Sequence, residues 1–194
     1  TVDCGPVQKI PEHIDFSVAA LAEPLACCLN GYERCGELSF SSVLVFGCGP
    51  IGMMLGMLGK YFGAKTVVLV DGNQARLDMA LQCHAGDFGL NANDPNLLDK
   101  INDITAGQGV DRIFTACPVS STHELGIKML AKRGVINLFG GLPDTEPSIL
   151  FSSNEIHYKE AVITGSHGST PRQHTEALKL ITNGSIDVSP LITH

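Results

Sequence analysis

The sequence has no tryptophan and few charged residues. Charged side chains make up 17% of its 194 residues, against about 25% in ordinary globular proteins. Lysine and arginine do not cluster anywhere, and 13 basic against 20 acidic residues leave a net charge of -7. Nucleic acids and anionic membrane surfaces attract proteins through concentrated positive charge. The composition therefore predicts no nucleic-acid partner and no membrane partner, and it favours a small or neutral ligand.

The seven cysteines form no C-x-x-C pair and have no regular spacing. Zinc knuckles and disulfide frameworks depend on such spacing. We therefore expect most of these thiols to be reduced and buried as small apolar groups. Residues 1–10 also lack the basic start and apolar run of a secretory signal. These absences predict a cytoplasmic protein.

One stretch without formal charge, residues 40–59, has the length of a membrane span. Its internal pattern argues against that interpretation. A short β-branched and aromatic run at 43–46 is followed by glycines and a proline, and helix-forming methionines and leucines resume at 53–58. The stretch therefore predicts a strand, a turn and a helix.

The rest of the chain alternates short apolar runs with helical segments, which is typical of a parallel sheet with helices on both faces. The expected strands are 43–46, 66–70, 110–116, 135–139 and 161–164. The expected helices are 50–62, 73–83, 97–104, 122–131 and 171–182, with another over 16–35. That last helix should be interrupted near Pro24, because proline lacks a backbone N–H and disfavours α geometry before it. The predicted class is an α/β fold with a doubly wound parallel sheet.

A glycine motif of the form G-x-G-x-x-G lies between the first strand and the next helix. Its members are Gly47, Cys48, Gly49, Pro50, Ile51 and Gly52. Such glycines permit a tight turn, let a pyrophosphate approach the backbone, and allow the helix to pack on the strand. The helix N-terminus adds free N–H groups and a partial positive charge. Taken alone, the motif also fits an ordinary glycine-rich turn.

Support for a dinucleotide comes from the following strand. Asp71 ends that strand, nineteen positions beyond Gly52, where this fold places an acid that accepts hydrogen bonds from the ribose hydroxyls. The carboxylate would repel a 2′-phosphate, so it favours NAD over NADP. Arg76 could reach the same ribose or the adenine edge, although it also fits an exposed helix cation. The pattern as a whole predicts a Rossmann NAD-binding domain.

Five further segments, in order, resemble the medium-chain zinc-dependent alcohol dehydrogenases. They are Glu23-Pro24-Leu25, Gly109-Val110-Asp111, Gly134 to Gly141, Ile163 to Ser166, and Asp187 to Ile192. The Glu-Pro pair is most similar to the sorbitol, iditol and threonine dehydrogenase branch. The resemblance covers nearly the whole chain. It implies a dinucleotide-binding domain at 39–168, flanked at 1–38 and 169–194 by short segments of an incomplete catalytic domain.

The resemblance also implies an activity. Zinc would polarise the oxygen of a secondary alcohol, a polyol or sugar derivative, and hydride would pass to NAD. Glu23 would lie near the zinc, in direct contact or through water. Judged from the sequence pattern alone, without the family resemblance, Glu23 also fits an acidic residue at the start of a helix. Groups at the ends of three strands would lie along the nicotinamide half of the coenzyme, namely Cys117, Phe139, Gly140 and Ser166.

Other family features are expected outside this sequence. The family's main zinc cysteine, its zinc histidine and the neighbouring glutamate belong to an N-terminal domain. His123 and Glu124 lie on a predicted helix, where we expect them at the surface, and the other histidines have no ligand spacing. We therefore expect no catalytic residue in this sequence, weak binding of NAD and no turnover by the chain alone.

The sequence also leads to an expectation about oligomers and leaves two alternative functions open. The strand at Gly134–Phe139 with the segment Leu142–Phe151 resembles the edge through which family members pair into homodimers or homotetramers. A regulatory dinucleotide sensor would share the glycine motif and the acid but would not need Glu23. A methyltransferase would bind S-adenosylmethionine at a similar site, usually with a shorter glycine loop.

Overall fold

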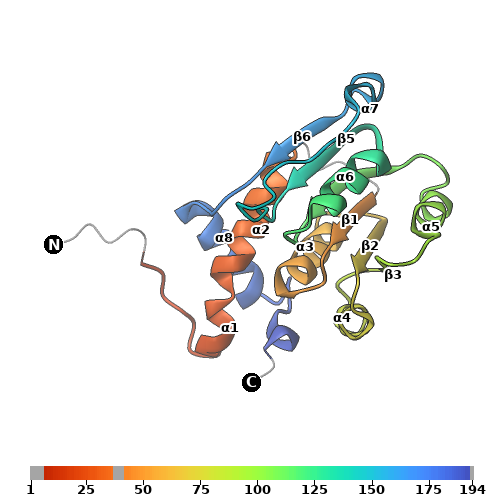
Figure 1. The fold of residues 1–194 in the computed structure, drawn as a ribbon. Coiled ribbons are helices and arrows are strands. Elements are labelled where there is room, and N and C mark those ends of the chain that lie inside the picture. Colours follow the sequence, from red (N-terminus) through yellow and green to blue (C-terminus); the bar gives the residue numbers. More distant parts are fainter. Residues whose placement is uncertain (1–6, 37–41, 193–194) are drawn as a thin grey trace.

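The computed structural model describes residues 7–36 and 42–192, which form a six-stranded parallel sheet with helices on both faces (Figure 1). The strands are β1 (Ser42–Phe46), β2 (Thr66–Asp71), β3 (Phe88–Asn91), β4 (Val110–Thr115), β5 (Leu130–Leu138) and β6 (Val162–Gly165). Their order in the sheet is β3-β2-β1-β4-β5-β6. The predicted doubly wound α/β fold is confirmed.

Eight α-helices cover this sheet in the described part of the chain. They are α1 (Phe16–Ala20), α2 (Ala22–Arg34), α3 (Pro50–Tyr61), α4 (Gln74–Gln82), α5 (Leu97–Ile104), α6 (Ser120–Met129), α7 (Ser153–Lys159) and α8 (Pro171–Thr182). Apolar residues of α2, α3, α4 and α8 form one buried cluster, and those of α5, α6 and α7 contribute to a second. The sheet separates these two layers.

Alternate residues of strands β1 and β2 enter the two clusters. In β1, Val43 and Val45 pack into the first cluster, while Leu44 and Phe46 pack into the second. Successive side chains of a strand point to opposite faces, so a strand covered on both sides is apolar throughout. This explains the uncharged runs in the sequence. None of the helices within 7–36 and 42–192 has the length and hydropathy needed to cross a membrane.

Among the strands and α-helices, two short elements were not predicted from the sequence. Strand β3 lies at one edge of the sheet, and its Phe88 is 44% exposed. Helix α7 has no fully buried residue. Neither element therefore carries the apolar periodicity on which the prediction depended. The helix expected at 122–131 also ends earlier, at Met129, because Leu130 and Ala131 already belong to β5.

The helix break expected near Pro24 lies at Leu21, between α1 and α2. Pro24 is the third residue of α2, in its first turn. The N–H groups of a first turn have no partner within the helix, so proline is tolerated there. Glu23 is placed in the same turn, close to the expected helix start. The expected boundary between residues 38 and 39 lies outside the described residues, and the domain division remains a prediction.

Candidate functional site

The order of strands in the sheet reverses between β1 and β4, and ligands of open α/β sheets bind at such a point. Phe46 at the end of β1 is in register with Val70 in β2 and with Thr115 in β4. The residues that follow these three therefore meet at one edge. A cavity of about 480 Å³ opens there, and the residues that line it include Gly47, Asp71, Arg76 and Cys117.

Two glycines of the motif, Gly47 in the loop after β1 and Gly52 in the first turn of α3, are required by the protein's own backbone. Gly47 has a φ of +96°, and its N–H donates a 2.7 Å hydrogen bond to the carbonyl of Val70. A Cβ atom on Gly52 would lie 1.7 Å from the carbonyl oxygen of Gly47. The loop and the first turn of α3 can thus approach each other only with glycine at position 52.

Gly49 differs from these two, because nothing in the described part of the protein lies within 4 Å of the Cβ it would carry. It is the N-cap of α3, has an ordinary φ of -72°, and is followed by Pro50 at the first helical position. Gly49 has no side chain with which to cap the N–H groups of Ile51 and Gly52. This open space beside free helix N–H groups fits a phosphate.

The carboxylate of Asp71 is held by backbone N–H groups on both sides. Oδ2 accepts a 2.7 Å hydrogen bond from the N–H of Cys48, and Oδ1 accepts a 2.8 Å bond from the N–H of Asn73. The Asp71 side chain is 10% exposed, and an Arg76 nitrogen lies 4.0 Å from Oδ2. Each carboxylate oxygen retains acceptor capacity. Asp71 can therefore accept further hydrogen bonds from hydroxyl groups in the cavity.

A second cavity, of about 410 Å³, lies between α2 and the ends of β5 and β6. Its lining residues are Glu23, Pro24, Cys27, Ile51, Phe139, Ser166, His167 and Gly168. Ile51 belongs also to the glycine motif, and Gly47 of the same motif lines the first cavity, so the two cavities flank this loop. A Cβ on Gly140 would lie 3.0 Å from the backbone of Cys117, which borders the first cavity. The structure thus brings the residues expected along a dinucleotide to one edge of the sheet.

Glu23 and Cys27 form a pair on α2, in which the Cys27 thiol donates a 3.3 Å hydrogen bond to Glu23 Oε1. Burial and the neighbouring Glu23 carboxylate raise the pKa of Cys27, so the group remains a thiol. A protein zinc site needs at least three side-chain ligands. Within 7–36 and 42–192, no three His, Cys, Asp or Glu residues are grouped to hold a metal ion. These residues alone do not fit zinc.

Asn137 is a site residue that the sequence analysis missed. It is fully buried in β5, its Oδ1 accepts a 3.1 Å hydrogen bond from the Ser166 hydroxyl, and its Nδ2 donates a 2.9 Å bond to the carbonyl of Gly31 in α2. Asn137 therefore links β5, α2 and the loop after β6. A lone amide within the apolar run before Phe139 was the available signal.

His123 is buried, with an exposed fraction of 2%, so its expected surface position is wrong. It shares the inward face of α6 with Gly126 and Ile127, at the i+3 and i+4 spacing of a buried stripe. Burial lowers the pKa of His123, and a hydrogen bond with the Cys117 backbone partly opposes this. Its neighbour Glu124 is partly exposed and accepts a 2.8 Å hydrogen bond from the N–H of Leu150.

The sheet order and the glycine loop define a Rossmann-like α/β domain. Residues 50–183, more than half of the chain, match the family model described as zinc-binding dehydrogenase. The chain belongs to this family.

Similar curated proteins place the chain on the threonine and sorbitol dehydrogenase branch. It is 29% identical to an L-threonine 3-dehydrogenase of Bacillus velezensis and 26% identical to a sorbitol dehydrogenase of Halalkalibacterium halodurans, each over 192 residues. Each alignment covers 97% of this chain and 54% of the relative. The chain thus spans about half the length of the curated relatives it matches.

Solved structures agree with this placement. An alcohol dehydrogenase of Thermotoga maritima matches with a TM-score of 0.87 at 26% identity, over 96% of this chain and 52% of that one. A zinc-binding dehydrogenase of Sinorhizobium meliloti bound to NADP matches with a TM-score of 0.84 at 26% identity, over 93% of this chain and 52% of that one. The resemblance noted in the sequence is confirmed.

Proposed function

We propose that this chain is the NAD-binding part of a zinc-dependent dehydrogenase that oxidises a secondary alcohol, a polyol or sugar derivative. The observation that carries the proposal is the pairing of Asp71 with the glycine loop. The N–H of Cys48 within that loop donates to Asp71, so the ribose acceptor and the open phosphate cradle at Gly49 lie in one fixed arrangement. The relatives named threonine and sorbitol dehydrogenase support this activity.

The choice of coenzyme depends on Asp71 rather than on the fold. A related structure is bound to NADP, so the shared fold accommodates a coenzyme with a 2′-phosphate. In this chain a carboxylate ends β2 at the edge of the cavity. It would accept hydrogen bonds from ribose hydroxyls and repel a 2′-phosphate. We therefore expect NAD to bind in preference to NADP.

The two cavities divide the coenzyme between them. The adenosine half would occupy the larger cavity beside Asp71 and Arg76, and the pyrophosphate would contact the backbone from Gly49 to Gly52. The nicotinamide half would extend along Cys117, Phe139, Gly140 and Ser166 toward the cavity that Glu23 lines. Bound NAD supplies the hydride acceptor. The residues of this chain bind the coenzyme and orient it.

Zinc enters the proposal only through Glu23, in direct contact or through water. The described residues bring no three candidate ligands together. In the complete protein the other ligands would come from the half of the relatives' length that this chain does not span. The domain division at 1–38, 39–168 and 169–194 belongs to the same proposal. We expect the chain alone to reduce no NAD with a polyol, and measurable turnover would contradict this.

Thermal unfolding of the purified chain tests coenzyme binding. A ligand that binds only the folded state stabilises it by RT ln(1 + [L]/Kd), about 2.7 kcal/mol at a hundredfold excess over Kd. We expect NADH to raise the Tm and S-adenosylmethionine to leave it unchanged. The opposite result would favour a methyltransferase. A non-catalytic dinucleotide sensor remains the alternative function, but the matched relatives are named as dehydrogenases, and a sensor would not need Glu23 in the second cavity.

We also propose a cytoplasmic homodimer or homotetramer. The pairing edge expected at Gly134–Phe139 is wrong, because most of that stretch belongs to β5, and β6 pairs with β5 on its outer side. Strand β6 is one of the two edges of the sheet, opposite β3. Large apolar side chains are exposed on β6, on α7 and on the segment before α7, namely Leu150 (83%), Phe151 (40%), Tyr158 (74%) and Val162 (49%). An exposed edge strand with apolar neighbours is a template for pairing with a second copy.

A further inference from the structure

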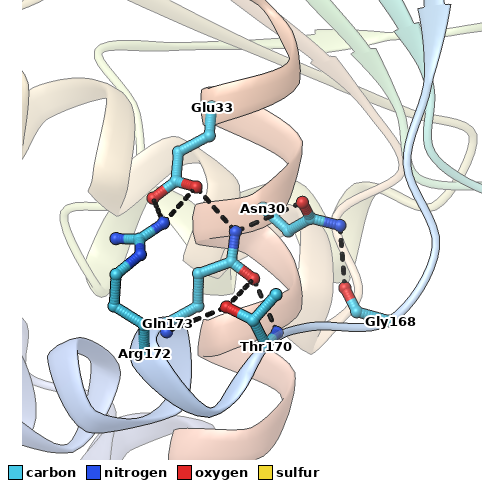
Figure 2. Close-up of polar contacts among 6 residues, drawn as sticks. All are labelled: Asn30, Glu33, Gly168, Thr170, Arg172 and Gln173. Carbon is cyan, nitrogen blue, oxygen red and sulfur yellow. Dashed lines mark hydrogen bonds and ion pairs between the residues drawn. The ribbon is translucent and has the colours of Figure 1, made fainter.

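A polar cluster with two buried amides lies between α2 and α8, behind one wall of the 410 Å³ cavity. It consists of Asn30 and Gln173, which are 7% and 2% exposed, together with Thr170, Glu33 and the carbonyl of Gly168 (Figure 2). Buried amide side chains cost free energy unless their hydrogen bonds are satisfied. The hydrogen bonds of these two amides therefore show which segments they hold together.

Asn30 joins α2 to the loop after β6. Its Nδ2 donates a 3.0 Å hydrogen bond to the carbonyl of Gly168, and its Oδ1 accepts a 3.2 Å bond from Nε2 of Gln173 (Figure 2). Reversing the Asn30 amide would place oxygen against oxygen at Gly168 and nitrogen against nitrogen at Gln173. The orientation of this side chain is thus fixed by its two partners.

Gln173 uses both ends of its amide. Oε1 accepts hydrogen bonds from the N–H of Thr170 (2.7 Å) and from its hydroxyl (3.0 Å), which forms part of the capping box of α8. Nε2 donates to Asn30 and also to Glu33 Oε2 at 2.7 Å. Only an amide can accept from Thr170 and donate to both other residues at once.

The outer end of the cluster is an ion pair. Arg172 donates to both carboxylate oxygens of Glu33, at 2.7 and 2.6 Å. Burial acts to raise the pKa of Glu33, but the hydrogen bonds from Arg172 and Gln173 outweigh it and lower the pKa. Glu33 is therefore a charged acceptor that keeps the Gln173 amide in its orientation.

Asn30 lies on the same side of α2 as Glu23 and Cys27, since the three are spaced at i, i+4 and i+7. Glu23 and Cys27 line one wall of the 410 Å³ cavity, and Ser166, His167 and Gly168 line the other. The hydrogen bond from Asn30 to Gly168 therefore joins the two walls. Residues 167–170 are exposed, so the position of this loop depends on its few anchors.

We propose that Asn30 and Gln173 are positioning residues for the nicotinamide half of the coenzyme. They fix the loop that carries Ser166 relative to the helix that carries Glu23, and so set the width of the cavity between them. The proposal rests on the NAD-binding function proposed above and deepens it. Without these anchors, the adenosine half would bind as before while the nicotinamide half would lose its outer wall.

Two variants test the role, each in the 194-residue chain. Asn30→Ala removes the anchor, and the exposed Gly168 can then bond to water. Gln173→Glu keeps the acceptors for Thr170 but removes both N–H donors and sets a carboxylate beside Glu33. The control is Gln108→Glu, the same change at an exposed position that lines a different cavity, at the opposite end of the sheet.

The first measurement is amide hydrogen exchange over residues 165–170 without ligand. We expect both variants to accelerate it roughly three- to tenfold, the effect of losing one or two net hydrogen bonds, while β1 keeps its protection. The second measurement compares Kd for NADH with Kd for AMP. We expect weaker binding of NADH, by a similar factor, and unchanged binding of AMP.

The outcomes separate the two proposals. A wild-type chain that binds neither NADH nor AMP would contradict the NAD site itself. Unchanged loop exchange in both variants would contradict the positioning role. Loop exchange could also become faster while the Kd values for NADH and AMP change equally, or while neither Kd changes. Either result would contradict the positioning role, because the cluster would then only stabilise the fold.

Discussion

Asp71 is the side chain on which the proposed coenzyme preference depends. Replacing it in Asp71→Asn removes the charge and turns one acceptor oxygen into a donor nitrogen. We expect Kd for NADH to rise about tenfold or more, because a hydrogen bond to a charged group contributes about 1.5 kcal/mol or more. Binding of NADPH should weaken less or improve. Asp78→Asn on α4 is the matched control, since Asp78 is exposed and accepts a hydrogen bond from Gln74. An unchanged ratio of the two affinities would contradict the assignment.

His123 makes stability depend on pH. Burial lowers its pKa in the folded chain, below the unfolded value of about 6.5. Near that pH the unfolded state therefore binds more protons than the folded state. The stability contributed by neutral His123 is present above about pH 6.5, and it is lost as the pH falls from there through the lowered pKa of the folded chain. We expect His123→Gln to reduce the loss of unfolding free energy between pH 7.5 and 5.5, measured by urea denaturation. An equally steep loss in the variant would refute this role.

Single residues differ in how well the sequence predicted where they lie. The glycines and Asp71 were recognisable because their spacing is fixed by a local strand, turn and helix. Asn30, Asn137 and Gln173 were missed because their partners are distant in the chain, for example Gly31 for Asn137. His123 was misplaced because two adjacent polar residues were interpreted as an exposed pair, although only one of them lies on the inward face of α6.

Substitutions at two glycines of helix α3 and the loop before it should affect stability and coenzyme binding separately. Gly52→Ala places a Cβ 1.7 Å from the Gly47 carbonyl oxygen. We expect this overpacking to cost about 1–3 kcal/mol and to lower the Tm by several degrees.

Gly49→Ala meets open space, so the loss of unfolding free energy should stay below about 1 kcal/mol. Its methyl group would nevertheless occupy the proposed phosphate position. We expect weak NADH binding with a nearly normal Tm, measured by calorimetry and thermal unfolding. Tight binding by Gly49→Ala would contradict the phosphate cradle.

The elements that the sequence predicted best are the strands buried on both faces and the helices with one clear apolar face. Strands β1 and β2 have uninterrupted apolar runs at 43–46 and 67–70, and α8 has a clear apolar face and a capping box. Strand β3 and helix α7 lie where one side is exposed, so their sequences carry little periodicity. Strand β5 was predicted short because Gly134 interrupts it, and its first residues continue the apolar pattern of α6.

The arrangement of the sheet leads to a prediction about association. Strand β6 is the edge with exposed apolar neighbours on α7 and on the segment before it, and a charge within this strand should prevent pairing with a second copy. We expect Val162→Lys to shift the chain from dimer to monomer in sedimentation velocity. Leu98→Lys is the control, because Leu98 is a 41% exposed apolar residue on α5, near the opposite edge. Dimers that persist in Val162→Lys, or dissociate equally in Leu98→Lys, would contradict pairing through β6.

The most direct test of the central claim is the equilibrium affinity of the 194-residue chain for NADH and for NADPH, titrated under the same conditions of salt and pH. The glycine loop, the open position at Gly49 and the carboxylate of Asp71 together predict measurable binding of NADH and weaker binding of NADPH. Tighter binding of NADPH, or no binding of either coenzyme, would contradict the account.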